Sequence, residues 1–245
     1  MSGSATRRRR IAIVPARGGS KGLPGKNLAI VGGLSLLARA VGCAKESGLF
    51  DYVLVSTDDA AIAEEGRRAG ASVPFLRPDA LAGDKAAVID AIRDALARLQ
   101  AAGEAPFHLV ALLEPTSPMR TPEILRRTVE AAESEGADAA VTVSEAPLRF
   151  HPLKQFELDE RGMARHAHPA AGKVVNRQEL RPTYVRNGLC YAVRVAALDA
   201  GHGVLGTAPR AVLVEGPIVN IDDPEDLALA RRLLEGKATV DRSGG

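Results

Sequence analysis

Residues 11–27 read IAIVPARGGSKGLPGKN, a short apolar run followed at once by a glycine-rich, basic loop. Residues 11–15 are rich in β-branched side chains, which predicts a strand. The loop carries Arg17, Lys21 and Lys26, and its glycines let backbone N–H groups turn towards an anion. We therefore expect a polyphosphate site at the carboxyl end of a parallel strand.

This loop matches neither of the two best-known phosphate-binding loops. A P-loop has Gly, four residues and then Gly-Lys-Ser/Thr. Counting back from Gly25, the first Gly position holds Ser20, and Asn27 stands where Ser or Thr is needed. The dinucleotide fingerprint needs Gly-x-Gly spacing, which Gly18-Gly19-Ser20 lacks. The loop therefore belongs to neither class.

Beyond this loop, predicted strands and helices alternate along the chain. Such alternation favours an α/β fold with a mostly parallel sheet flanked by helices. We assign residues 10–146 and 187–236 to this α/β domain. The expected strands are 11–15, 52–56, 107–113, 139–143, 189–193 and 211–214, and the expected helices are 36–46, 60–69, 86–101, 122–135 and one from 224 that stops near 235–236.

Capping residues mark where several of these helices begin. Asp58 or Asp59 is available as an N-cap for the helix at 60–69. Thr121 is followed by Pro at the first helical position and by an acidic residue, a typical helix start. Asp223 and Asp226 are expected to begin the last helix in the same way.

The alternation breaks at residues 147–186, which show no helical period and include a candidate strand at 153–158. About 40 residues bury too little surface to fold alone, so we expect a β-rich insertion in the α/β domain. Residues 1–9, with the basic run at 7–10, are expected to form a disordered, solvated lead-in. Residues 237–245 are expected to form a C-terminal tail.

Composition limits the classes of function. The 32 basic and 30 acidic residues nearly cancel, so the chain has no general character of a nucleic-acid binder. No stretch approaches the roughly 18 apolar residues of a membrane span, and no signal-peptide core follows the basic run. Cys43 and Cys190 fall in a predicted helix and strand, which indicates reduced, buried thiols in a cytoplasmic protein.

Six further motifs follow in order along the chain. With the loop at 16–27, they resemble the acylneuraminate-type cytidylyltransferases, which activate sialic acid and related keto-sugar acids as CMP conjugates. The resemblance spans residues 10–235 and implies a Rossmann-like fold. It also implies a homodimer in which the insertion reaches over the partner's active site. The motifs are STDD at 56–59, Arg77-Pro78 with Asp84, LEPTSPMR at 113–120, Arg177-Gln178, NGLCY at 187–191 and NIDDPEDL at 220–227.

Nucleotide-binding residues are expected in the first loop and in a base pocket. Arg17 and Lys21 suit a triphosphate clamp, since Arg binds phosphate bidentately and Lys acts as a mobile charge. Ser20 adds a hydroxyl donor, Lys26 is a secondary candidate, and the resemblance places Asn27 near the base or ribose.

The resemblance also places Arg77 and Asp84 at the cytosine base. The family often has a hydroxyl residue shortly after that Asp, whereas this chain continues KAAV at 85–88. Selectivity for cytosine over uracil is therefore left open.

A metal site is expected at Asn220 and Asp222. Positions two apart in an extended segment face the same side, and Mg²⁺ prefers oxygen ligands completed by water and phosphate. The family shows Asp-x-Asp here, whereas this chain has Asn at the first position. The number of metal ions, one or two, therefore stays open.

Acceptor-binding residues are implied by the resemblance in three motifs and in the insertion. They are Glu114, Ser117, Lys154, Arg177, Asn187 and Tyr191. Relatives that use sialic-type substrates have Gln where this chain has Glu114, and an ionised Glu only accepts hydrogen bonds. The other basic residues near the insertion add positive charge for an anionic acceptor. His151, His166, His168 and His202 are expected at the surface.

Together these features indicate a Mg²⁺-dependent cytidylyltransferase. An anomeric hydroxyl of a 2-keto-3-deoxy sugar acid would attack the α-phosphate of CTP and release pyrophosphate, with Arg17, Lys21 and Asp222 as the catalytic groups. Three alternatives stay open: a small phosphonate as acceptor, another nucleotide as in sugar-phosphate nucleotidylyltransferases, and a non-catalytic nucleotide-binding regulator.

Overall fold

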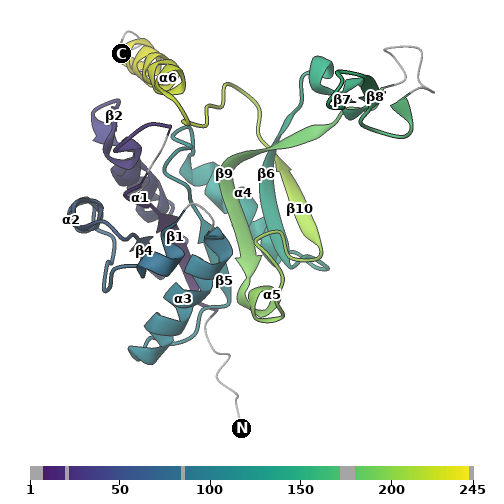
Figure 1. The fold of residues 1–245 in the computed structure, drawn as a ribbon. Coiled ribbons are helices and arrows are strands. Elements are labelled where there is room, and N and C mark those ends of the chain that lie inside the picture. Colours follow the sequence, from purple (N-terminus) through teal and green to yellow (C-terminus); the bar gives the residue numbers. More distant parts are fainter. Residues whose placement is uncertain (1–7, 20–21, 84–85, 172–179, 243–245) are drawn as a thin grey trace.

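A computed structural model describes residues 8–19, 22–83, 86–171 and 180–242. Its centre is a six-stranded sheet in the order β10-β6-β9-β5-β1-β4 (Figure 1). The strands are β1 (Arg10–Pro15), β4 (Tyr52–Ser56), β5 (Leu109–Leu112), β6 (Ala139–Glu145), β9 (Tyr184–Arg194) and β10 (Pro209–Leu213). A separate hairpin pairs β2 (Ile30–Val31) with β3 (Leu34–Ser35).

The sheet is mixed but mostly parallel, as the sequence predicts. Strand β1 pairs in parallel with β4 and β5, and β10 pairs in parallel with β6. Strand β9 is antiparallel to both β5 and β6, so it alone in this sheet runs the other way. It also begins at Tyr184, five residues before the expected start, because its first part extends the pairing with β6 towards the insertion.

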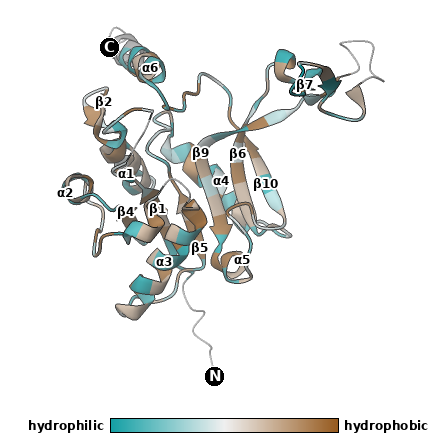
Figure 2. Cartoon of the chain, in the orientation of Figure 1, coloured by the Kyte–Doolittle hydropathy of each residue, from teal (hydrophilic) through white to brown (hydrophobic). Residues whose placement is uncertain are grey.

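Helices cover both faces of the sheet (Figure 1). They are α1 (Leu36–Glu46), α2 (Ala60–Arg68), α3 (Val88–Ala101), α4 (Pro122–Glu133), the short α5 (Val195–Asp199) and α6 (Pro224–Arg242). Alternate residues of β1 point to opposite faces. Ala12 and Val14 pack with α1, α2 and α4, whereas Ile11 and Ile13 pack with α3 and α5. Figure 2 shows the resulting apolar strands at the centre of the molecule.

The helix starts expected from capping residues are confirmed, whereas the helix expected from residue 86 begins at Val88. Asp59 caps α2, Thr121 caps α4, and Pro122 and Glu123 occupy the first turn of α4. At the start of α6, Asp223 accepts a hydrogen bond from the N–H of Asp226, whose own carboxylate accepts from the N–H of Asp223.

The predicted end of the last helix is wrong. Helix α6 continues through Gly236 to Arg242 instead of stopping near 235–236, and it takes in much of the expected C-terminal tail. A single Gly costs only about 1 kcal/mol in a helix that is already growing, whereas each added residue gains a backbone hydrogen bond.

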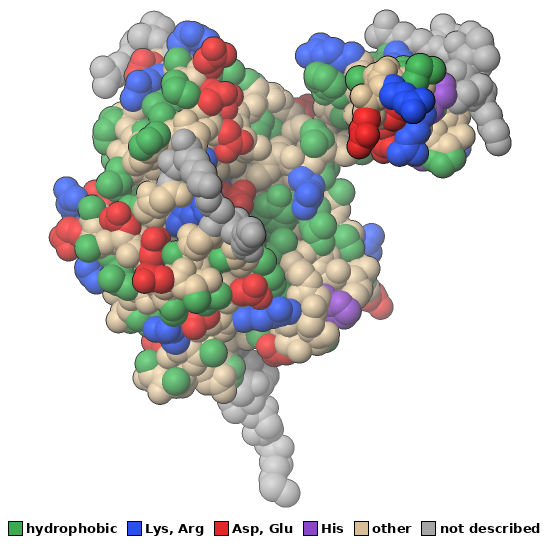
Figure 3. Space-filling model, in the orientation of Figure 1, with side chains coloured by type: hydrophobic (Ala, Val, Ile, Leu, Met, Phe, Trp, Pro, Cys, Tyr) green, Lys and Arg blue, Asp and Glu red, His purple; other side chains and the backbone are tan. Residues whose placement is uncertain are grey.

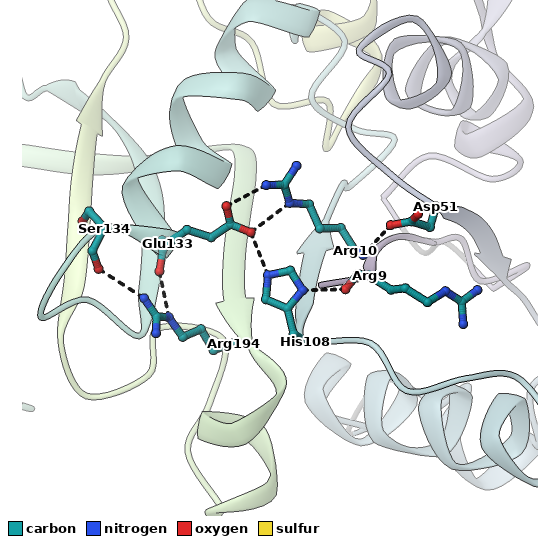
Figure 4. Close-up of polar contacts among 8 residues, drawn as sticks. Arg9, Arg10, Asp51, His108, Glu133, Ser134 and Arg194 are labelled. Carbon is teal, nitrogen blue, oxygen red and sulfur yellow. Dashed lines mark hydrogen bonds and ion pairs between the residues drawn. The ribbon is translucent and has the colours of Figure 1, made fainter. Parts of the chain in front are cut away.

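The basic run at 7–10 is not wholly a solvated lead-in. Arg10 forms two hydrogen bonds of 2.8 and 2.7 Å with the Glu133 carboxylate, and His108 contacts the same carboxylate at 2.7 Å (Figure 4). Arg9 pairs with Glu104 at 2.9 Å. These acids lie within reach because β1 lies inside the sheet, between β5 and β4, so the loops and helix ends beside it surround its amino end. Residues 1–7 lie outside the described residues.

The described part of the insertion forms an arm, which we define as residues 147–171. It contains two single 3-10 turns, η3 (Leu148–Phe150) and η4 (Pro152–Lys154), and a hairpin of β7 (Phe156–Leu158) with β8 (Ala164–His166). The arm projects away from the sheet (Figures 1 and 3). The strand expected at 153–158 begins only at Phe156, because Pro152 starts a 3-10 turn instead.

One histidine of the arm was predicted wrongly. His151 is buried: its Nε2 donates to the carbonyl of Arg181, and its Nδ1 accepts from the N–H of Leu153. It joins the outgoing and returning chains at the base of the arm, a contact that no local sequence pattern indicates. His166, His168 and His202 are exposed, as expected. No helix in the described part of the chain is long and apolar enough to span a membrane.

Candidate active site

A cavity of about 660 Å³ opens at the edge of the sheet where the parallel strands end. Its walls come from the loop after β1, the segment between α2 and α3, the turn after β5 and residues 219–223 before α6, which we call the strap. Carboxyl ends of neighbouring parallel strands are the usual ligand site of such sheets. The structure brings together at this cavity seven of the residues predicted from the sequence: Arg17, Lys26, Asn27, Arg77, Glu114, Asn220 and Asp222.

The loop after β1 is held by side chains on both sides. Asn27 is buried, and its Nδ2 donates to the carbonyl of Arg17 over 3.0 Å. The N–H of Gly18 donates to Asp58 Oδ1, also over 3.0 Å. Gly25 adopts φ 68°, a left-handed conformation that favours glycine, just before the turn that carries Lys26. Ser20 and Lys21 lie outside the described residues.

Arg77 lies in the wall between α2 and α3. Its guanidinium is buried and donates to both the hydroxyl and the carbonyl oxygen of Ser56, the last residue of β4. Burial lowers the pKa of Arg77, and Asp58 partly offsets this effect. Arg77 thus fixes the end of β4 while its side chain lines the cavity. Asp84, predicted beside it, lies outside the described residues.

The turn after β5 is held by Arg120, which was not assigned a role from the sequence although it belongs to the motif at 113–120. Its guanidinium is buried and donates to the carbonyls of Leu189 and, over 2.9 Å, Glu114. Burial lowers its pKa. An Arg that satisfies two carbonyls inside the fold cannot be told from a ligand-binding Arg by sequence alone.

Glu114 carries a carboxylate for which no hydrogen bond within the described residues is found. Burial raises the pKa of Glu114, the neighbouring Arg120 opposes this rise, and Asp222 adds to it. A desolvated carboxylate in a cavity is typical of a functional group, since burial without a partner destabilises its charged form.

The strap is joined to the turn after β5 and to β9. The N–H of Ile221 donates to the carbonyl of Thr116 over 2.9 Å, and Ser117 Oγ donates to Asn220 Oδ1 over 2.7 Å. Gly188 at φ 71° leaves room for this pair, since a Cβ there would lie 2.9 Å from Ser117 Oγ and 3.0 Å from Asn220 Oδ1. The strap therefore sits in a fixed place between two elements.

Lys26 joins the loop after β1 to the strap. Its ammonium lies 3.1 Å from Asp222 Oδ1 and 3.1 Å from the carbonyl of Ile221. The Lys26 side chain is 18% exposed and that of Asp222 is 81% exposed. The carboxylate expected to bind metal is thus paired with a cation and open to solvent.

The predicted acceptor residues occupy different places. Asn187 is buried, with Nδ2 donating to Ser144 Oγ and Oδ1 accepting from the N–H of Leu189. Tyr191 is half-buried on β9. Its burial raises its pKa, and the nearby Glu114 raises it further. Lys154 lies exposed on the arm and does not line the cavity of its own chain. Arg177 lies outside the described residues.

Both thiols are free and buried. Burial raises the pKa of Cys43 to about 11 and that of Cys190 to about 12. Because the thiolate is the reactive form, neither is suited to act as a nucleophile at neutral pH. This agrees with the expectation of unreactive buried thiols.

The fold and the cavity together are those of an α/β protein with a ligand site at the carboxyl ends of its parallel strands. A family profile described as cytidylyltransferase matches residues 11–187. The CMP-N,N'-diacetyllegionaminic acid synthase of Legionella pneumophila is 33% identical over 92% of this chain and 96% of its own length. The N-acylneuraminate cytidylyltransferase of Streptococcus agalactiae is 34% identical over 74% of this chain and 42% of its own.

A solved CMP:2-keto-3-deoxy-manno-octonic acid synthetase, in complex with CTP, shares the fold. Its TM-score is 0.71 at 17% identity, over 94% of this chain and 99% of its own. The chain therefore belongs to the cytidylyltransferase family, and it is a nucleotidyltransferase.

Proposed function

We propose that this enzyme transfers CMP from CTP to a 2-keto-3-deoxy sugar acid of the sialic, legionaminic or pseudaminic type. The acceptor hydroxyl attacks the α-phosphorus, the bond between the α-phosphorus and its bridging oxygen breaks, and pyrophosphate leaves. The observation that carries this proposal is the full-length similarity to a CMP-legionaminic acid synthase, in a chain whose cavity gathers the predicted nucleotide residues.

The nucleotide side of the cavity is assigned to the loop after β1 and to Arg77. Arg17 and Lys26 neutralise the triphosphate, and Ser20 and Lys21 complete this clamp. Most of the catalysis in phosphoryl transfer comes from such positioning and charge neutralisation. Asn27 and Arg77, whose polar groups already brace the loop and β4, line the side where the base and ribose lie. Asp84 stays a proposed base contact.

A magnesium ion is assigned to the strap. No group of three or more His, Cys, Asp or Glu side chains within the described ranges is arranged to hold a metal. The donors nevertheless fit Mg²⁺, which is commonly held by one or two carboxylates and completed by phosphate and water. Asp222 offers an exposed carboxylate at the cavity, and Asn220 offers a carbonyl oxygen that Ser117 already engages. The ion when bound would shield phosphate charge and favour ionisation of the hydroxyl nucleophile.

The acceptor side is assigned to Glu114 and the residues around it. Glu114 lies near enough to Tyr191 to raise the pKa of its hydroxyl. Ser117 and Asn187 use their polar groups within the chain, so we assign them the shaping of this wall. Arg177 and Lys154 are assigned to the acceptor carboxylate.

The assembly is assigned as a homodimer in which the arm covers the partner's cavity. Support comes from the exposed apolar side chains of the arm: Phe150, Phe156, Leu158 and Met163 are between 55% and 69% exposed. Lys154 on the same arm would then contribute to the partner's site, which explains why it does not line the cavity of its own chain.

A pyrophosphate-release screen tests the reaction. The four ribonucleoside triphosphates are crossed with keto-sugar acids and small phosphonates in the presence of Mg²⁺. We expect release only with CTP and a sugar acid, and its loss in Asp222→Ala with CTP binding retained. Release only with a phosphonate would replace the acceptor, and no release with nucleotide still bound would favour a regulator.

A further inference from the structure

We propose that the Lys26 ammonium competes with the metal for Asp222. Binding of the nucleotide triphosphate, which removes Lys26, then favours binding of the metal. The Lys26 ammonium holds the Asp222 carboxylate, at 3.1 Å from its Oδ1. The triphosphate draws Lys26 away and so opens Asp222 to the divalent cation. This inference rests on the proposed function, because it takes Asp222 as the metal ligand.

The first support is the position of the ammonium. It contacts two groups of the strap, Asp222 Oδ1 and the carbonyl of Ile221, each over 3.1 Å. The ammonium is thus held by two oxygen atoms, one from a carbonyl and one from a carboxylate, as a bound metal cation would be. A divalent ion and an ammonium that share one carboxylate repel each other, since both are positive. The metal is therefore expected to bind Asp222 more weakly while Lys26 remains at Oδ1.

The second support is that the strap is held by its neighbours, whereas the Lys26 side chain has several rotatable bonds. The strap is fixed by the hydrogen bond from Ile221 to Thr116. The loop after β1 touches the strap directly, because a Cβ on Gly22 would lie only 2.5 Å from the carbonyl oxygen of Asp222. The two segments are thus already in contact and cannot move closer together. Rotation of the long Lys26 side chain is the smallest movement that releases Asp222.

The third support is the weakness of the pair that must break. The Asp222 side chain is 81% exposed, and exposed ion pairs contribute little to stability. The same cavity wall presents Lys26 to any phosphate that Arg17 binds. A triphosphate carries several negative charges, whereas Asp222 carries one. Lys26 is therefore attracted more strongly by the triphosphate than by Asp222. By thermodynamic linkage, the triphosphate and the divalent cation then each strengthen binding of the other.

The experiment measures two affinities of the full chain that should move in opposite directions. Free Mn²⁺ is titrated by electron paramagnetic resonance without nucleotide, and CTP binding is measured by calorimetry in EDTA. In Lys26→Met we expect Mn²⁺ to bind about threefold more tightly, the change that removal of an exposed ion pair allows. We expect CTP to bind more weakly. A merely structural defect would weaken both.

Three variants complete the test. Lys26→Arg keeps the charge and should keep the wild-type Mn²⁺ affinity. Asp222→Asn should lose the Mn²⁺ site of the strap. Because Lys26 is then no longer paired with a carboxylate, this variant should bind CTP in EDTA at least as tightly as the wild type. Lys45→Met removes one exposed positive charge from α1, outside the cavity, and should change neither affinity.

Unchanged or weaker Mn²⁺ binding in Lys26→Met would overturn the proposal, as would weaker CTP binding in Asp222→Asn. Neither measurement requires turnover. A failure of the proposed reaction would appear separately, as absent pyrophosphate release by the wild-type enzyme.

Discussion

Gly22 in the loop after β1 reads simply as a flexible residue in the sequence, but in the structure it lies against the strap. A Cβ on Gly22 would meet the Asp222 carbonyl at 2.5 Å, whereas nothing lies within 4 Å of one on Gly203. In Gly22→Ala the strap must shift, and displacement of a metal ligand is expected to lower kcat/KM by about tenfold or more. Pyrophosphate-release kinetics measure this. Gly203→Ala, which does not line the cavity, is the matched control and should keep wild-type kinetics; equal loss in both variants would contradict the assignment.

Glu114 gives a pH-dependent prediction. Burial raises its pKa in the folded enzyme above that of the unfolded chain, so folding favours the protonated form. Its destabilising effect is absent below the unfolded pKa of about 4.3 and grows as pH rises through the folded pKa. Glu114→Gln should therefore raise Tm at pH 7 and leave it unchanged at pH 4, which thermal unfolding at both values measures. A gain equal at both values would mean that ionisation is not the cause.

Among the elements, the start of α6 connects helix stability to the site. The Asp226 carboxylate accepts from the N–H of Asp222 over 3.0 Å as well as from that of Asp223. Asp226→Ala should cost about 1 kcal/mol of stability as a lost cap. It should also weaken Mn²⁺ binding, because it frees the backbone of the metal ligand.

Ser35→Ala provides the comparison for Asp226→Ala. Ser35 caps α1 by accepting from the N–H of Ala38 and does not line the cavity. It should lose similar stability and keep Mn²⁺ affinity. A wild-type affinity in Asp226→Ala would show that the strap holds its place without this cap.

Element by element, local signals predicted best. Thr121 and Asp59 mark the starts of their helices, because each side chain accepts a hydrogen bond from a backbone N–H no more than three residues later. Both predictions are confirmed. The direction and length of β9 were not predictable, because they depend on pairing with β6, some 40 residues earlier. The end of α6 was predicted wrongly because the low helix preference of Gly236 was given too much weight. The helix already formed before Gly236 continues through it.

Across the whole molecule, the sequence identified cavity residues better than it assigned their contacts. Seven of them do line one cavity, because strand ends at the same edge of a parallel sheet must meet there. Arg77 and Asn27 nevertheless direct polar groups to the protein backbone. Arg120 holds the turn after β5 without having been assigned a role. Such contacts join distant segments and leave no pattern in the residues nearby.

The arm carries the last prediction, which concerns assembly. Exposed apolar side chains on a projecting hairpin would be costly in a monomer, and a second chain that covers them would gain their burial. We expect a dimer in analytical ultracentrifugation.

Leu158→Asp, which changes a side chain 69% exposed on β7, should then give a monomer. If the arm completes the partner's site, this monomer should also lose pyrophosphate release while keeping its fold by circular dichroism. Ile30→Asp changes a side chain 54% exposed on β2, away from the arm, and should remain dimeric and active. A wild-type chain that turns over as a monomer would exclude a shared site, because every contact with the acceptor would then have to come from one chain.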